Sequence, residues 1–285
     1  MPTDKQTAAL ARARSFLFVP GNRPERFAKA LASGADAIVL DLEDAVPADE
    51  KATARAAIAA AWPDLRQAAI PVVVRMNPPA LDCGREDLQL LASLDAPAAV
   101  MVPKAESGED LAGVRSALPA TALLPLIESA AGYTALATVA GAAGVLRLVL
   151  GDLDFMADTG LQCSADAIEL APLRFAIAIS TRTNQLAPAV EGVTADFRND
   201  DLLRADTRRA LRFGFGAKLC IHPHQIPIVH ATLRPTTAEI NWAKRVLEAD
   251  AAAGGSAVQL DGQMVDLAVV LQARRLLARV PEEDA

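Results

Sequence analysis

Short apolar runs recur along this sequence, and a segment with helical spacing of apolar residues follows nearly every run. The runs lie at 15–20, 37–41, 71–76, 99–103, 122–128 and 147–151, with weaker ones at 189–193 and 217–221. A strand that is apolar at almost every position is buried on both faces, which is typical of a parallel sheet covered by helices. The repeats therefore predict an α/β fold, a TIM (β/α)8 barrel, with a doubly wound sheet as the alternative.

The last part of the chain follows a different pattern. Residues 236–252 predict one long helix, 254–262 a turn or hairpin, and 265–279 a final helix. A closed barrel has no room inside for these elements. We therefore divide the chain into a barrel, 1–230, and a C-terminal helical arm, 231–285, which is expected to lie across its own barrel mouth or to reach a neighbouring subunit.

Charge and cysteine content exclude several classes of partner. The 28 Lys and Arg against 35 Asp and Glu give a net charge of −7, without a basic tract, so nucleic acid and anionic membranes are not expected partners. Cys83, Cys163 and Cys220 form no CxxC pair, which indicates neither a disulfide framework nor a zinc knuckle. A polar amino terminus and the absence of a bilayer-length apolar run predict a cytoplasmic protein.

Polar residues follow most of the apolar runs, where the carboxyl ends of parallel strands meet at one mouth. They are Asn22, Arg23, Asp41, Glu43, Asp44, Arg75, Asn77, Lys104, Glu106, Glu128 and Asp154. Cations and several carboxylates that converge on one face suit the binding of a hard divalent ion together with an anionic substrate.

Glu128 and Asp154 end two consecutive apolar runs, so they are expected on adjacent strands at similar height. A carboxylate at the end of an apolar strand is costly unless it is paired or binds a metal. Magnesium keeps part of its hydration shell and takes one or two protein carboxylates. The pair therefore predicts a magnesium site; the alternative is that each acid caps the helix that follows it.

Arg75 ends the run 71–76 and is expected to emerge at the same mouth. Its planar guanidinium is suited to bind a carboxylate or an enolate oxygen. A salt bridge with Glu43 or Asp44 is an equally good interpretation, and the two roles are compatible.

Seven segments, in order, carry a resemblance to a known family. They are 17–24 (LFVPGNRP), 40–46 (LDLEDAV), 74–77 (VRMN), 126–129 (LIES), 151–155 (GDLDF), 220–225 (CIHPHQ) and 262–266 (GQMVD). Together they resemble the ordered motifs of the HpcH/HpaI aldolase and citrate lyase β-subunit-like family, and the resemblance covers nearly the whole chain.

The resemblance implies a TIM barrel, commonly a homotrimer or homohexamer, that binds Mg²⁺ through Glu128 and Asp154. Relatives cleave small 3-hydroxy-acyl thioesters such as malyl-, citramalyl- and citryl-CoA into a keto acid and an acyl thioester, or form them from these two compounds. Arg75 matches the active-site arginine of the family, and Asp266 matches an aspartate that enters a neighbour's site in several relatives. Arg75, Asp266 and Glu43 are the predicted catalytic residues.

The resemblance also implies that Asn22, Arg23 and Lys29 bind the phosphates of coenzyme A; the alternative is that Arg23 and Lys29 are solvated helix charges. One departure concerns Asp152, which places an extra carboxylate beside the predicted metal ligand Asp154. The exact substrate is therefore left open.

Three other functions stay open besides the thioester lyase. The chain could be a metal-dependent aldolase that acts on free 2-keto-hydroxy acids, or a malyl-CoA thioesterase. It could also be a subunit without its own catalysis that docks with an acyl-carrier complex. Whether coenzyme A or a carrier protein holds the acyl group is not decided by these motifs.

Overall fold

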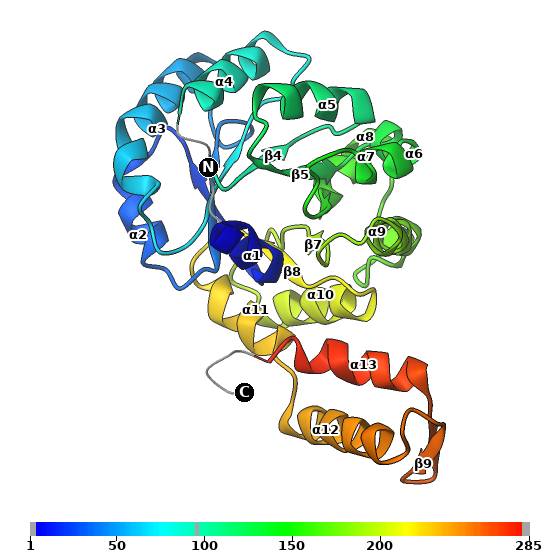
Figure 1. Ribbon diagram of the computed structural model, residues 1–285. Coiled ribbons are helices and arrows are strands. Elements are labelled where there is room, and N and C mark those ends of the chain that lie inside the picture. The colour runs from blue at the N-terminus through cyan, green and yellow to red at the C-terminus, as the bar shows by residue number, and fades with distance from the viewer. Residues whose placement is uncertain (1–3, 95–96, 281–285) are drawn as a thin grey trace. The chain divides into compact units, whose positions relative to one another are not determined.

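The computed structural model describes residues 4–94 and 97–280, and its larger part is a closed barrel of eight parallel strands surrounded by helices (Figure 1). The strands follow one another around the barrel in sequence order, and β1 pairs with both β2 and β8. The predicted (β/α)8 barrel is thus confirmed, and the doubly wound alternative is wrong because that sheet would stay open.

The strands begin and end close to the predicted apolar runs. They are β1 (Ser15–Pro20), β2 (Ala37–Asp41), β3 (Val72–Arg75), β4 (Ala99–Val102), β5 (Ala122–Ile127), β6 (Val149–Leu150), β7 (Val190–Glu191) and β8 (Ala217–Cys220). β6 and β7 are the shortest, with two residues each.

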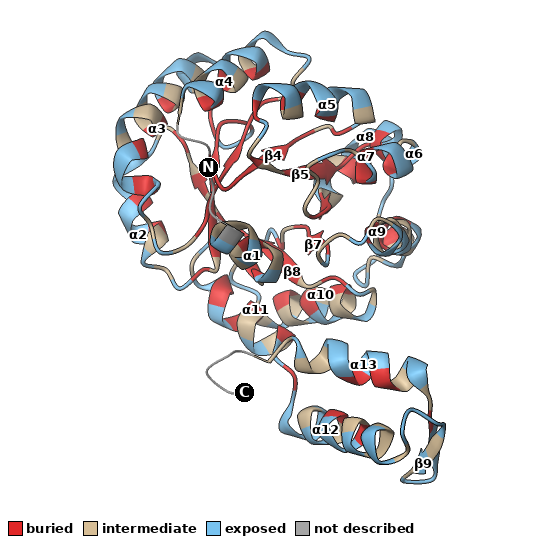
Figure 2. Cartoon of the chain, viewed as in Figure 1, coloured by how far each residue is buried: buried red, intermediate tan, exposed pale blue. Residues whose placement is uncertain are grey.

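Most helices lie around the strands with their buried residues facing inward, whereas α1 lies across one end of the barrel, where Leu10 joins the interior cluster (Figures 1 and 2). They are α1 (Asp4–Arg12), α2 (Phe27–Leu31), α3 (Lys51–Leu65), α4 (Asp82–Ser93), α5 (Gly108–Ala117), α6 (Ala130–Thr134), α7 (Leu136–Ala140), α8 (Asp152–Thr159), α9 (Ala171–Thr183), α10 (Asp200–Arg212) and α11 (Gln225–Leu233), with the 3-10 helices η1 (Pro24–Arg26), η2 (Ala48–Glu50) and η3 (Ile168–Leu170). Among the described helices, none combines the length and apolarity needed to cross a bilayer.

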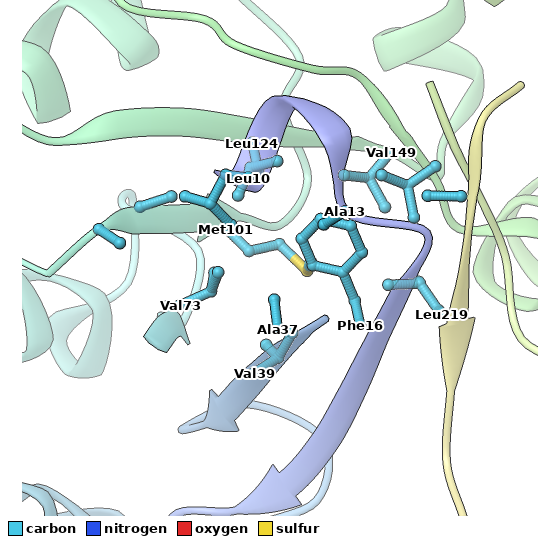
Figure 3. Close-up of a cluster of buried hydrophobic side chains, with 14 of the residues drawn as sticks. Leu10, Ala13, Phe16, Ala37, Val39, Val73, Met101, Leu124, Val149 and Leu219 are labelled. Atoms are coloured by element: carbon cyan, nitrogen blue, oxygen red, sulfur yellow. The ribbon is translucent and has the colours of Figure 1, made fainter. Parts of the chain in front are cut away.

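Apolar side chains fill the inside of the barrel (Figure 3). Val39 of β2, Val73 of β3 and Leu126 of β5 belong to this cluster. Because side chains alternate along a strand, the residue two positions further on faces the same way. Those residues are Asp41, Arg75 and Glu128. At the mouth, polar side chains therefore take the inward-facing positions that apolar side chains occupy deeper in the barrel. In this way the fold positions the site.

Arg147 holds the opposite, amino-terminal end of the barrel together. Its side chain is 1% exposed and donates to the carbonyl oxygens of Leu10 (2.8 Å), Ala13 (2.7 Å) and Pro188 (2.7 Å). The guanidinium also lies 5.4 Å from the centre of the Phe16 ring. Burial lowers the pKa of Arg147 to about 9. The residue joins the end of α1 to the loop before β7, two segments far apart in the chain.

A second compact unit begins at Leu233. It contains α12 (Thr237–Ala252), the antiparallel strands β9 (Val258–Leu260) and β10 (Gln263–Val265), and α13 (Leu267–Leu277). Its own small core is formed by Ala243, Val246, Val265, Val270 and Ala273.

The substitution Arg147→Met is expected to destabilise the barrel, because it leaves three carbonyl oxygens without their donor in a buried place. We expect a loss of about 3–4 kcal/mol in the free energy of unfolding. Chemical denaturation measures this loss, with Arg208→Met, at an exposed position of α10, as the control. Equal stability of the two variants would show that the carbonyl contacts of Arg147 contribute nothing.

Candidate active site

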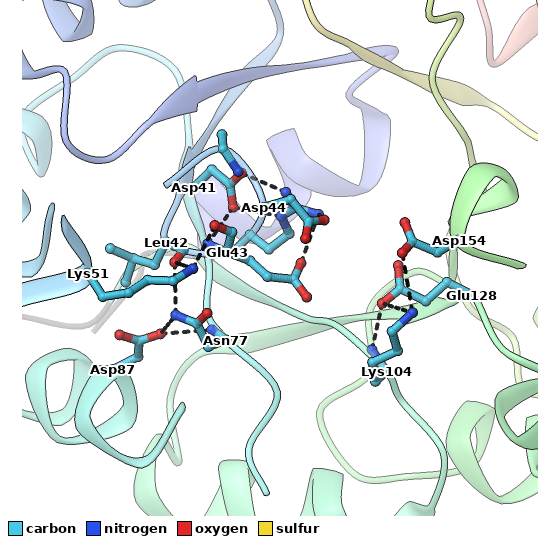
Figure 4. Close-up of polar contacts among 12 residues, drawn as sticks. Asp41, Leu42, Glu43, Asp44, Lys51, Asn77, Asp87, Lys104, Glu128 and Asp154 are labelled. Carbon is cyan, nitrogen blue, oxygen red and sulfur yellow. Dashed lines mark hydrogen bonds and ion pairs between the residues drawn. The ribbon is translucent and has the colours of Figure 1, made fainter. Parts of the chain in front are cut away.

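Two groups of polar side chains lie at the carboxyl-terminal end of the barrel strands (Figure 4). One surrounds Arg75, at the end of β3, and includes residues from the loop after β2. The other contains Glu128 and Asp154, which follow β5 and β6, together with Lys104, which follows β4.

Three carboxylates lie along the edges of the Arg75 guanidinium, and the Phe18 ring lies against its face, 4.7 Å from Cζ. Its Nε and Nη2 donate to the two carboxylate oxygens of Asp41 at 2.7 and 2.6 Å. Asp41 and Arg75 are direct neighbours in the parallel pairing of β2 and β3, so the register of the sheet brings them together. Nη1 lies 2.9 Å from Glu43 Oε2 and 3.2 Å from Asp44 Oδ2. The expected salt bridges are therefore formed, and Asp41 adds a third.

Glu43 holds its proton more strongly than an ordinary glutamate. It is 8% exposed, and burial raises its pKa to about 8, against the lowering effect of Arg75. The neighbouring charges of Glu128, Asp44 and Asp41 add to the rise. Burial by itself lowers the pKa of Arg75, but Asp41 and the other carboxylates raise it overall. The group thus combines a charged guanidinium with a carboxyl group whose pKa lies well above the ordinary glutamate value.

Hydrogen bonds from the half-buried Lys51 and the buried Asn77 fix the loop that carries Glu43. Lys51 Nζ donates to the carbonyl oxygens of Leu42 and Glu43, both at 2.7 Å. Asn77 Nδ2 donates to Leu42 O at 2.8 Å and to Asp87 Oδ2 at 2.6 Å. The sequence analysis did not single out Lys51 or Asp87, because both lie in helices and no local motif marks them.

Glu128 directly follows β5, whereas Asp154 lies in the first turn of α8 and not on the adjacent strand β6 as predicted. The two acids are nevertheless neighbours, since both lie near the ammonium of Lys104 (Figure 4). Glu128 is 2% exposed, and its Oε1 accepts from the backbone N–H of Lys104 at 2.8 Å. Lys104 Nζ lies 3.7 Å from the same oxygen and 3.4 Å from Asp154 Oδ1. Burial raises the pKa of Glu128 to about 7, although its contacts with Lys104 lower it.

The helix-end alternative is wrong for Glu128 but holds for Asp154, which lies in the first turn of α8, where the helix dipole favours an acid. Ser129, rather than Glu128, caps α6 and accepts from Gly132 N. Gly151 is the N-cap of α8 and makes no side-chain capping bond, while Asp154 lies in the first turn. A Cβ atom at Gly151 would lie 2.7 Å from Glu128 Oε2, so a glycine is required for the end of β6 to approach this carboxylate.

The chemistry of these donors fits magnesium. Two carboxylates offer hard oxygen ligands, and the ion fills its other positions with water or substrate oxygens. In residues 4–94 and 97–280, no group of three or more His, Cys, Asp and Glu side chains is arranged to hold a metal.

The predicted coenzyme A residues lie on the first loop and on α2. Asn22 Nδ2 donates to Glu50 Oε2 at 2.5 Å, while its buried Oδ1 has no partner among the described residues. Arg23 pairs with Glu25 at 2.6 Å, and Lys29 is exposed on α2. Only Arg23 and Lys29 of the three are cations, and the charge of Arg23 is already paired with Glu25.

The remaining predicted residues have local roles in the structure. Asp266 caps α13 by accepting from the backbone N–H groups of Ala268 (2.9 Å) and Val269 (3.1 Å). Asp152 lines a cavity of about 220 Å³ that also contains Arg174 and Glu191. Burial, followed by the charge of Glu191, raises the pKa of Asp152 to about 6.

The fold and the site define a (β/α)8 barrel with a carboxylate pair and a carboxylate-bound arginine at its mouth. The family model HpcH/HpaI aldolase/citrate lyase matches residues 14–223, and the chain belongs to this family.

Individual relatives cover almost the whole chain. A (3S)-malyl-CoA thioesterase of Cereibacter sphaeroides is 32% identical over 93% of this chain and 94% of its own length. A citrate lyase subunit beta-like protein of Deinococcus radiodurans is 35% identical over 93% of this chain and 96% of its own. The crystal structure of CitE from Mycobacterium tuberculosis in complex with magnesium, acetoacetate and coenzyme A has a TM-score of 0.81 at 33% identity, covering 94% of this chain and 98% of that chain.

The substitution Glu43→Gln is expected to weaken the pH dependence of stability in metal-free protein. Folded Glu43 keeps its proton up to about pH 8, whereas the usual glutamate value is 4.5. The folded state therefore binds more protons in this window, and the free energy of unfolding falls as pH rises through it. Glutamine cannot ionise and removes that part of the fall.

Denaturation between pH 5 and about 9 in EDTA measures this effect. The control is Glu248→Gln, at an exposed position of α12. A slope in Glu43→Gln equal to that of the wild type would show that Glu43 ionises normally.

Proposed function

We propose that the protein is a magnesium-dependent carbon–carbon lyase that cleaves or forms a small 3-hydroxy-acyl thioester, such as malyl-, citramalyl- or citryl-CoA. The products of cleavage are a keto acid and an acyl thioester. The observation that supports this most directly is the pair of adjacent carboxylates, Glu128 and Asp154, at the same mouth as Arg75. The magnesium, acetoacetate and coenzyme A bound by the CitE relative support the same chemistry.

Glu128 and Asp154 hold the metal ion in this proposal. When bound, Mg²⁺ supplies Lewis-acid polarisation of the substrate oxygens. Glu128 is buried, so its surroundings fix the orientation of its carboxylate. The side chain of Asp154 is 44% exposed, so a substrate can reach it. Burial makes the interaction of Glu128 with the ion stronger than it would be in water.

Arg75 stabilises the negative charge that develops on the thioester enolate when the carbon–carbon bond breaks. Asp41 occupies its Nε and Nη2 edge and fixes the plane of the guanidinium. Nη1 donates to Asp44 Oδ2 at 3.2 Å, and because the side chain of Asp44 is 64% exposed, a substrate oxygen can replace it on this donor.

Asp266 of a second copy of the chain protonates the enolate carbon, in a homotrimer or homohexamer. Two large apolar neighbours support a docking role for this segment, since Met264 and Leu267 are 68% and 69% exposed. Asn22, Arg23 and Lys29 bind the phosphates of coenzyme A, for which the exposed charges of Arg23 and Lys29 are suited.

The second candidate is malyl-CoA thioesterase activity, which the 32% identical relative favours. The same metal and the same arginine would serve both reactions. The products differ, because hydrolysis of the thioester releases the intact hydroxy acid and free coenzyme A.

The substitution Glu128→Gln removes the buried metal ligand while it keeps the size of the side chain. We expect release of keto acid from malyl- or citramalyl-CoA to fall by more than about 100-fold, and EDTA to cause a similar loss in the wild type. A coupled assay of the keto acid measures both, with Glu248→Gln as the control for a lost surface charge. Full activity in Glu128→Gln or in EDTA would contradict the metal site.

A mixing experiment tests whether Asp266 acts in a neighbouring subunit. Asp266→Asn and Glu128→Gln are each expected to be nearly inactive alone. Unfolded together and refolded as mixed oligomers, they form some sites with an intact Glu128 from one copy and an intact Asp266 from another. Random mixing at equal amounts restores up to about a quarter of the wild-type activity. No recovery in mixed oligomers would contradict the shared site.

A further inference from the structure

Lys104 has an unusual backbone conformation for a residue with a side chain. It follows β4, and its φ angle is +47°, in the left-handed region. Residues other than glycine seldom adopt this region because the Cβ atom meets the neighbouring carbonyl oxygen. Such strain persists only where the surrounding contacts require it. Lys104 is therefore held in place for the contacts that it makes.

Those contacts all go to the predicted metal ligands. The backbone N–H of Lys104 donates to Glu128 Oε1 at 2.8 Å. Its ammonium group turns back to lie 3.7 Å from the same oxygen and 3.4 Å from Asp154 Oδ1. One residue thus contacts Glu128 from both its main chain and its side chain, and the side chain also reaches the second carboxylate.

The main-chain and side-chain contacts of Lys104 with the carboxylates differ in how easily they can be broken. The main-chain bond is part of the loop after β4 and stays with the fold. The ammonium belongs to a side chain that is 35% exposed, so it can move into water by rotation of its own bonds. Glu128, at 2% exposure, cannot move into water and needs a positive charge beside it.

We infer that Lys104 is a tethered cation that neutralises Glu128 and Asp154 in the metal-free protein and competes with the divalent ion for them. This inference rests on the proposed metal site. An ion that binds the two carboxylates displaces the ammonium, while the main-chain N–H continues to orient Glu128. The displaced ammonium then lies at the mouth, where it is available to an anionic substrate.

The competition makes the metal affinity of the wild type weaker than the two carboxylates alone would give. Removal of the ammonium therefore has two opposite effects. The metal-free protein loses a favourable pair and becomes less stable. The metal-bound protein loses a repulsive neighbour, so Mg²⁺ binds more tightly.

Calorimetric titration with MgCl₂ tests this inference, with thermal unfolding in EDTA as the second measurement. The variants are Lys104→Met and Lys104→Gln, which remove the charge in two ways, and Lys104→Arg, which keeps it. Lys244→Met, at an exposed position of α12 in the second unit, controls for the change in net charge. Titrations at pH 8.5 and constant ionic strength keep protons from competing with the metal.

We expect Mg²⁺ to bind about five- to tenfold more tightly to the two uncharged variants than to the wild type, and their metal-free melting temperatures to fall. Lys104→Arg and Lys244→Met are expected to stay within about twofold of the wild type. If the wild type binds Mg²⁺ and the uncharged variants bind it equally or more weakly, the inference about Lys104 is wrong, while the proposed metal site stands. Absence of Mg²⁺ binding in the wild type overturns the proposed metal site as well.

Discussion

Glu128 continues the apolar interior face of β5, and its burial at 2% exposure is the constraint on which the site depends. A carboxylate in this place is stable only with a cation or with donors close to it. The barrel provides the main-chain N–H of Lys104 at 2.8 Å and its ammonium at 3.7 Å. The glycine at position 151 leaves room for the carboxylate, since a Cβ there would lie 2.6 Å from Glu128 Cβ.

In the group around Arg75 the charges are reversed, because the buried residue is a cation and its partners are carboxylates. A buried guanidinium is neutralised by the carboxylate of Asp41, and Glu43 and Asp44 lie on its remaining side. More acids than cations lie at this mouth. Burial, with the charges of neighbouring acids, raises the pKa of Glu43 to about 8 and that of Glu128 to about 7. A divalent cation would relieve this excess of negative charge, so the electrostatics of the two groups and the proposed metal chemistry agree.

The sequence was sufficient to predict the barrel and the residues at its mouth. Continuous apolar runs marked β1 to β5 well, because a strand buried on both faces needs no polar alternation. Arg75, Glu128 and Asp154 were found because each polar residue lies at or just after the end of such a run. Those signals are local, and the structure brought Glu128 and Asp154 together as the order of the strands required.

Contacts that depend on register, loop conformation or helix faces could not be predicted in this way. Both Asp41 and Arg75 were recognised as polar strand ends, yet only the pairing of β2 with β3 makes them partners. No sequence pattern predicts the left-handed backbone of Lys104. Asp87 lies in the middle of α4, and its burial becomes clear only from the packing of that helix. Asp152 was expected near the metal ligand, whereas the structure places it in a cavity with Arg174 and Glu191.

Identification of both products from a single reaction tests the central claim most directly. Malyl-, citramalyl- and β-methylmalyl-CoA are each incubated with the enzyme and Mg²⁺, and mass spectrometry follows the acids and the thioesters together. The account predicts equal amounts of a keto acid and a shortened acyl-CoA from at least one substrate. Release of the intact hydroxy acid with free coenzyme A, and no keto acid, would contradict the lyase and establish the thioesterase.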